Sequence, residues 1–327
     1  MFKLNRILIV SLALLLVAML AQVGKVQAQV LNPAASSDPW LQKPVLPYFL
    51  LTKDARLEKE SQNLFTALGL SEQGKGMMHQ IALEEQQLMR DFYGETQVIV
   101  QDETLSPADK EKGVQDSRYN ERVAEAMMDT DQAVRKLLGS RYPLFRTWIA
   151  DWWTREGKAV DELKQSAGQP GIDSVAYACY MFATQYFGYT DYEIALPDRY
   201  VKFANLGWYI PPPYNGWYAN PPYTADIYHE DYWVWGVLVR EVGPWNVDDN
   251  YWDTSSSSPP RRMFGNIPLC WSEAEYAYYY GYNGGKDQFG RTVTVPTSVD
   301  LTPSVAADLG LGYLENDFLT VYYYDLP

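Results

Sequence analysis

Aromatic side chains are the residues of this chain whose type and spacing best fit a binding chemistry. The chain holds 11 Trp and 26 Tyr, and flat aromatic faces stack on the C–H faces of sugar rings. Rings of this size also fill cores, so a glycan-binding groove and packing between loops both explain such a cluster. The rings concerned are Trp208, Tyr209, Trp217, Tyr218, Trp233, Trp235, Trp245 and Trp252.

Acidic and amide side chains bunch at Asp248, Asp249, Asn250 and Asp253. Hard oxygen ligands at this spacing can hold calcium, although they do not fit the EF-hand pattern, and a solvated turn explains them as well. The sequence has no His-Glu-x-x-His, Cys-x-x-Cys or Gly-x-Ser-x-Gly motif, and no Ser or Thr follows Gly284-Gly285-Lys286. We therefore expect neither a nucleotide or redox cofactor nor a metal site.

The formal net charge is −14. Nucleic acids and anionic lipid surfaces are bound by clustered Lys and Arg, so both are excluded as expected partners. The remaining partner classes are polysaccharide, peptide and protein.

The N-terminus has the three parts of a secretory signal peptide over residues 1–28. Lys3 and Arg6 give a positive region, residues 7–21 are apolar, and Val26-Gln27-Ala28 offers a cleavage site. The apolar run is shorter than the roughly 20 residues of a bilayer span, although an uncleaved anchor is the alternative. We expect an extracytoplasmic protein, secreted or associated with the cell wall, with no stable membrane insertion after cleavage.

Pattern and composition divide the rest of the chain into three segments. Residues 29–50 are punctuated by Pro and predict an extended tether. Residues 51–168 predict an antiparallel helical hairpin or bundle, with N-caps at Ser71 and Ser106 and a C-cap at Gly139. Residues 172–327 carry short Tyr-, Val- and Thr-rich runs between Pro, Gly and Asn clusters, which is typical of a β domain. The sequence thus predicts an α+β protein of two domains, with strands at 177–186, 200–204, 232–241, 292–295 and 318–324 and a short helix at 303–309.

Two cysteines, Cys179 and Cys270, lie in the β segment. Export makes a disulfide between them chemically possible. Two unpaired buried thiols are the alternative, because spacing alone does not bring two Cα atoms together.

From residue 174 onward the chain resembles the rare lipoprotein A and expansin-like family of six-stranded double-psi β-barrels, here with long loop insertions. The motifs that carry the resemblance are residues 183–188 (ATQYFG), 197–206 (PDRYVKFANL), 237–245 (VLVREVGPW) and 299–310 (VDLTPSVAADLG). The helical segment weakly resembles Spy- and CpxP-type periplasmic helical hairpins through residues 68–73 (LGLSEQ).

The barrel resemblance implies candidate site residues. Asp300 matches the family's aspartate and would act as proton donor, with Glu241 as its partner. The family's histidine has no counterpart between Gly188 and Leu196; the chain holds only His79 and His229, and His229 lies in another segment. We name as candidate glycan-binding residues Tyr186, Trp208, Trp235 and Trp245.

Three functions follow as expectations. The first is an exported bacterial protein whose barrel binds peptidoglycan or another extracellular glycan, with the helices as a spacer or an interaction surface for envelope proteins. The second is a glycan-cleaving enzyme, similar to a lytic transglycosylase or muramidase, that uses Asp300 as general acid. The third is a non-catalytic structural or protein-interaction component of the envelope.

Overall fold

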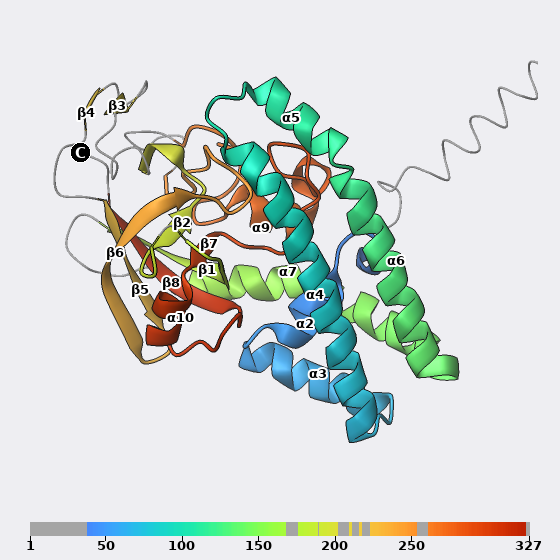
Figure 1. Cartoon of the computed structure of the whole chain (residues 1–327). Helices are drawn as coiled ribbons and strands as arrows, with labels where there is room; N and C mark the ends of the chain where they lie inside the picture. The colour runs from blue at the N-terminus through green and yellow to red at the C-terminus, as the bar shows by residue number, and fades with distance from the viewer. Residues whose placement is uncertain are drawn as a thin grey trace, which may run out of the picture. The chain divides into compact units, whose positions relative to one another are not determined.

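The computed structural model describes residues 38–167, 176–188, 190–201, 209–210, 216–217, 223–253 and 261–324. The expected signal peptide, most of the Pro-rich segment and Trp208 lie outside these ranges. From Pro39 onward the chain forms one compact unit, in which a helical region precedes a closed β-barrel (Figure 1). The predicted α+β class and the six-stranded barrel are confirmed.

The helical region is built around the long helices α4, α6 and α7. Its elements are η2 (Pro39–Leu41), α2 (Val45–Leu51), α3 (Ala55–Ala67), α4 (Glu72–Gln101), α5 (Pro107–Asp116), α6 (Tyr119–Leu138), η3 (Gly139–Arg141) and α7 (Tyr142–Ala167). The predicted caps are confirmed: Ser71 accepts from the Gly74 amide, Ser106 accepts from the Asp109 amide, and Gly139 ends α6. Among the described helices, none is both long and apolar enough to cross a bilayer.

The end of the segment expected to be an extended tether is instead helix α2. Pro44 stands at its N-cap and Pro47 in its first turn, where backbone N–H groups have no partner within the helix, so proline costs little there. Val45, Leu46 and Phe49 are each about 1% exposed. Burial of this apolar face therefore outweighs the local preference of proline for extended chain.

The barrel closes in the strand order β1-β7-β2-β6-β5-β8. Its strands are β1 (Ala176–Gln185), β2 (Ile194–Leu196), β5 (Thr224–His229), β6 (Tyr232–Val242), β7 (Val299–Leu301) and β8 (Asp317–Tyr324); β3 (Tyr209–Ile210) and β4 (Gly216–Trp217) pair separately. β1 pairs with β7 in parallel and with β8 antiparallel, and β2 likewise pairs with β6 and β7. Helices α9 (Glu273–Tyr280) and α10 (Pro303–Asp308) and the turn η4 (Tyr282–Gly284) lie in the connections.

Two expected strands are absent from the described residues. Around 200–204, residues 199–201 are helical, because Asp198 accepts the Tyr200 amide and starts a turn, while 202–204 lie outside the described ranges. Residues 292–295 make only an isolated bridge, between Thr292 and Lys286. The predicted strands at 177–186, 232–241 and 318–324 and the helix at 303–309 correspond to β1, β6, β8 and α10.

Two hydrophobic clusters hold the unit together, and the alternation of side chains along β1 shows how they meet. Met181 and Ala183 point into the barrel interior, while Phe182 points outward into a cluster shared with the helices. Phe318 on β8 joins the same outer cluster, where its ring packs edge-on against Phe182 at 5.1 Å. The helical region and the barrel therefore bury apolar surface against each other.

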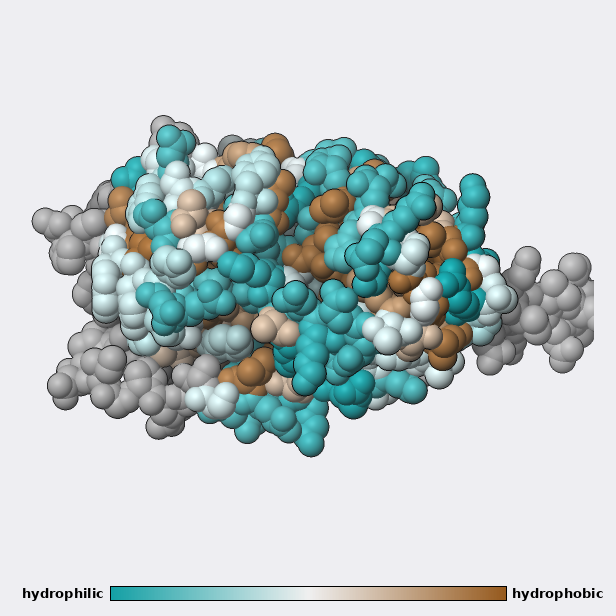
Figure 2. Space-filling view, turned by 90° about the horizontal axis from the view of Figure 1, so that it is seen from below, coloured by the Kyte–Doolittle hydropathy of each residue, from teal (hydrophilic) through white to brown (hydrophobic). Residues whose placement is uncertain are grey.

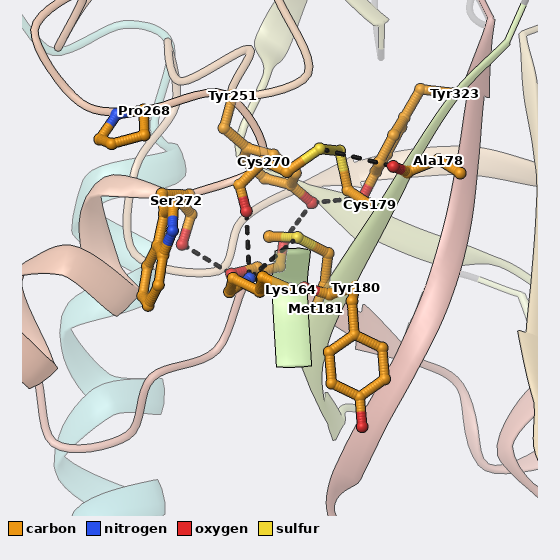
Figure 3. Close-up of a disulfide and its surroundings, with 12 residues drawn as sticks. Lys164, Ala178, Cys179, Tyr180, Met181, Tyr251, Pro268, Cys270, Ser272 and Tyr323 are labelled. Atoms are coloured by element: carbon orange, nitrogen blue, oxygen red, sulfur yellow. Dashed lines mark hydrogen bonds between the residues drawn. A yellow bond between two sulfur atoms is a disulfide. The ribbon is translucent and has the colours of Figure 1, made fainter. Parts of the chain in front are cut away.

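A disulfide joins β1 to the segment that precedes α9, and a buried lysine near the end of α7 attaches that helix to the same place (Figure 3). Cys179 on β1 and Cys270 are bonded across a sequence separation of 91 residues, and closing a loop of that order stabilises a fold by about 4–5 kcal/mol in the chain-entropy picture. Lys164 Nζ donates to the carbonyls of Cys270 at 3.0 Å and Tyr180 at 2.5 Å, and it pairs with Glu275 at 3.0 Å. Both charged side chains are at most 4% exposed.

We expect Lys164→Met to destabilise the protein by about 3–5 kcal/mol, because it leaves the Glu275 carboxylate buried without a cation. Chemical denaturation at neutral pH measures this change. Lys158→Met on the same helix is the matched control, since its pair with Glu162 is exposed and worth about 0.3–0.5 kcal/mol. Lys164→Met/Glu275→Gln should recover part of the loss. A double variant no more stable than Lys164→Met would show that the charge pairing contributes nothing.

Candidate functional site

A cavity of about 670 Å³ lies between helix α4 and the outer wall of the barrel. The barrel contributes Thr184, Tyr186, Ala195, Glu241 and Asp300 to its lining. Helix α4 contributes the opposite wall with Gln86, Gln87, Arg90, Asp91, Tyr93, Gly94, Gln97, Val98 and Gln101. The cavity is thus completed by the helical region, a role that was not expected for it from the sequence.

Strand register places the candidate carboxylates in one row across the barrel wall. Thr184 on β1 pairs with Asp300 on β7, and Asp300 pairs with Ala195 on β2. Ala195 in turn pairs with Glu241 on β6. Paired residues project from the same face of a sheet, and two strand spacings separate the Cα atoms of Asp300 and Glu241 by about 10 Å. The small Ala195 side chain leaves room for a ligand group between them.

Asp300 is held largely out of water, with 7% of its surface exposed. Its flanking residues Val299 and Leu301 point into the barrel core, so the carboxylate points out toward the cavity. Burial raises its pKa to about 6, against the lowering effects of a hydrogen bond from the Thr184 hydroxyl and of the Arg90 guanidinium. A carboxyl group with this pKa can hold or release a proton near neutral pH.

Tyr186 lies at the end of β1 beside this row. Its hydroxyl donates to Glu193 Oε1 at 3.3 Å, and its pKa is raised by burial and by the carboxylates of Glu193, Asp300 and Glu241. Gly188 makes this approach possible, because a Cβ there would stand 2.5 Å from Glu193 Oε1 and 2.9 Å from the Tyr186 oxygen. The glycine of the ATQYFG motif therefore has a packing role at the rim of the cavity.

Helix α4 is fixed to the barrel at the end of β6. Gln97 and Gln101 both donate their side-chain amides to the Val242 carbonyl, at 3.2 and 2.7 Å. The next residue, Gly243, has φ +140°, and a Cβ there would stand 3.0 Å from Gln97 Nε2. Gly243, the glycine of the motif at 237–245, thus takes a backbone conformation that other residues rarely adopt, and its missing side chain leaves room for Gln97 of α4.

Trp245 belongs to the cavity lining, but its side chain is buried behind the wall. Only 1% of it is exposed; its indole N–H donates to the Val295 carbonyl and its ring packs edge-on against Tyr93 at 4.8 Å. Trp245 therefore supports the wall and does not offer an open ring face. The exposed aromatic lining comes instead from Phe187 and Tyr313, which are 76% and 69% exposed with ring centroids 6.4 Å apart.

Two further residues considered in the sequence analysis, Trp235 and His229, do not line this cavity. Trp235 is 66% exposed and does not line it, and Trp208 lies outside the described residues. His229 ends β5 and is buried, and its ring nitrogens contact Leu309 O at 2.7 Å and Asp317 Oδ2 at 3.1 Å. Burial lowers its pKa, but these hydrogen bonds outweigh that effect and raise it above 6.5. His229 lines a separate cavity of about 240 Å³.

The acidic cluster after β6 is buried and is not a solvated turn. Asp248 pairs with Arg199, and Asp249 pairs with Arg261 at 2.6 Å with both side chains fully buried. Asp253 accepts from Asn250 at 2.8 Å. Arg199 and Arg261 thus neutralise Asp248 and Asp249. The sequence spacing did not predict these pairs. Over the described ranges, no group of three or more His, Cys, Asp or Glu side chains is placed to hold a metal ion.

We expect Asp300 to make the wild-type protein lose stability as pH rises from about 4 to about 6. Its folded pKa of about 6 exceeds the ordinary value of 3.8, so the folded state holds the extra proton across this window. Asp300→Asn should remove this dependence and gain stability relative to wild type over the same window. Denaturation at half-unit pH steps measures the difference, with the exposed Asp308→Asn as control. Parallel pH profiles for wild type and Asp300→Asn would contradict the assignment.

Comparison with known proteins adds one match. Residues 182–322, from within β1 to within β8, match a family described as a domain of unknown function, DUF8814. No curated protein and no solved structure matches the chain.

Proposed function

We propose that this is an exported bacterial protein whose barrel is of the double-psi type and whose cavity binds a strand of peptidoglycan or another extracellular glycan. The observation that carries the proposal is the row of Thr184, Asp300, Ala195 and Glu241 facing the polar wall of α4 across one cavity. The sequence motifs that suggested Asp300 and Glu241 are distant along the chain, yet both residues line this cavity.

The chemistry of the lining suits sugars. Carboxylates, amides and the Arg90 guanidinium supply acceptors and donors for hydroxyl groups, and Phe187 and Tyr313 supply exposed ring faces. Binding sites for small ligands combine such an apolar surface with a few placed polar groups. The net charge of −14 favours a ligand that is not a polyanion.

Two features support the fold type and the compartment. The closed barrel mixes parallel pairs, β1–β7 and β2–β6, with antiparallel pairs, and the motifs at 183–188, 237–245 and 299–310 overlap β1, β6 and β7. The Cys179–Cys270 disulfide is a bond that persists in oxidising compartments outside the cytoplasm.

Glycan cleavage is the second candidate, favoured by the pKa of about 6 at Asp300. A carboxyl group that stays partly protonated near neutral pH can donate a proton to the oxygen of a leaving sugar. Glu241 would orient the sugar or assist from the other side of Ala195. The family's histidine has no counterpart here, since His229 lines a different cavity, so the carboxylates would act without it.

Pull-down on purified peptidoglycan and on insoluble chitin and cellulose tests binding, and chromatography of released muropeptides tests cleavage. We expect Phe187→Ala and Tyr313→Ala each to weaken binding about fivefold, the effect of losing a ring contact of about 1 kcal/mol. If the protein cleaves glycan, Asp300→Asn should retain binding and reduce release by about 100-fold or more.

The matched control is Glu84→Gln, which removes one carboxylate from an exposed position of α4 that does not line the cavity. Binding without release would identify a binding module. Absence of both, in a folded protein, would contradict the proposal and favour the structural or protein-interaction alternative.

A further inference from the structure

A second group of aromatic side chains lies on the outer face of the barrel, on strands β5, β6 and β8. We call it the outer aromatic cluster: Tyr228, Trp233, Trp235 and Tyr322. None of its members lines the cavity beside α4. The face of the molecule in Figure 2 is mostly hydrophilic, with smaller hydrophobic patches. Trp233 and Trp235 are exposed side chains of this cluster that lie next to each other, and contiguous exposed aromatic surface is a common feature of interaction sites.

Trp233 lies at the centre of the cluster and contacts the other three rings. Trp233 and Trp235 have centroids 4.6 Å apart and planes within 6° of parallel. Trp233 also contacts Tyr228 at 4.6 Å and Tyr322 at 5.3 Å. Trp235 is 66% exposed, while Trp233 is 39% exposed. The contacts between the rings hold them in place, so a ligand would lose little entropy in ordering them.

A β-bulge in β6 affects which side chains of this strand face the barrel core and which face outward. Ile227 pairs with Val234, but Ala225 pairs with Val237, so β6 carries one extra residue opposite Asp226. Gly236 takes φ +65° at the bulge, and its amide donates to Asp226 Oδ1 at 2.7 Å. Because of the bulge, both Val234 and Val237 point into the barrel core, while Trp233 and Trp235 stay on the outer face.

We propose that the outer aromatic cluster is a second glycan-binding site, which takes an uncharged polysaccharide on the exposed ring of Trp235. The site is separate from the cavity, and its ligand is recognised by stacking of sugar C–H faces on the indole. The proposal does not depend on what the cavity binds.

Charge and ring type select this ligand over others. The hairpin that carries the cluster contributes the acids Asp226, Glu230 and Asp231, and the chain carries −14 overall. Nucleic acids and anionic lipids are repelled by that charge, and so is a second copy of the chain. Indole and phenol rings, unlike aliphatic side chains, offer both a flat face and a hydrogen-bonding edge for sugar hydroxyls.

Affinity electrophoresis in gels containing hydroxyethylcellulose, glycol chitin or laminarin tests the site. We expect wild type to be retarded by at least one of these neutral polysaccharides, and Trp235→Ala to weaken that binding about tenfold. The double variant Trp233→Ala/Trp235→Ala should abolish it. Tyr192→Ala, an aromatic residue with 42% exposure elsewhere on the surface, is the matched control and should bind as wild type does.

Two further measurements separate this site from the cavity. Bound polysaccharide should shift the tryptophan fluorescence of wild type, and Trp235→Ala should lose that shift. Asp300→Asn/Glu241→Gln should keep both the shift and the retardation, whatever it does to peptidoglycan binding. The proposal is overturned if no probe retards wild type, if Trp235→Ala binds as wild type does, or if the cavity variant alone removes binding. It is also overturned if sedimentation shows that the Trp variants only break a dimer.

Discussion

A single buried guanidinium, that of Arg291, ties helix α4 to the mouth of the barrel. It is fully buried and pairs with Asp287 at 2.6 Å. It also donates to Gln97 on α4 at 2.9 Å and to the Trp245 carbonyl at 2.6 Å. A buried charge is tolerated only when its donors are satisfied, so helix, loop and wall are held in one geometry. Together with the bonds from Gln97 and Gln101 to the Val242 carbonyl, these contacts hold α4 beside the barrel wall that it faces across the cavity.

Alternation along short strands decides which residues face that space. On β7, Val299 and Leu301 enter the barrel core and Asp300 must therefore face outward. The apolar side chains that pack and the carboxyl group that lines the cavity thus lie on opposite faces of the same three-residue strand. The barrel core fixes the row of side chains, and the outward face is available for a ligand. The same division holds on β6, where a bulge keeps Val234 and Val237 inside and two tryptophans outside.

Local signals predicted the helical region, its caps at Ser71, Ser106 and Gly139 and the strands β1, β6 and β8, because periodicity and capping residues act within a few positions. They missed α2 and α9, short helices most of whose residues are buried against the rest of the fold. The resemblance also identified Asp300 and Glu241, which the strand register brings to one row. It did not reveal α4 as the opposite wall. Gln86, Arg90, Gln97 and Gln101 recur at helical spacing, but only the fold shows that this polar face meets the barrel. Equally, the partners of Asp248 and Asp249 are arginines brought together by tertiary contacts that no local pattern encodes.

The shared cavity links ligand binding to the attachment of the two regions. A ligand that touches both α4 and the barrel wall binds only the assembled unit, so its binding free energy adds to the stability of the attachment. At a ligand concentration of 100 times Kd that gain is about 2.7 kcal/mol. This is comparable to the effect of losing one buried interaction in the interface. The outer aromatic cluster touches the barrel alone, so occupation of that surface would not stabilise the attachment of α4. The two proposed binding surfaces therefore differ in what a ligand would do: at the cavity it would bridge α4 and the barrel wall, and at the outer aromatic cluster it would contact the barrel alone.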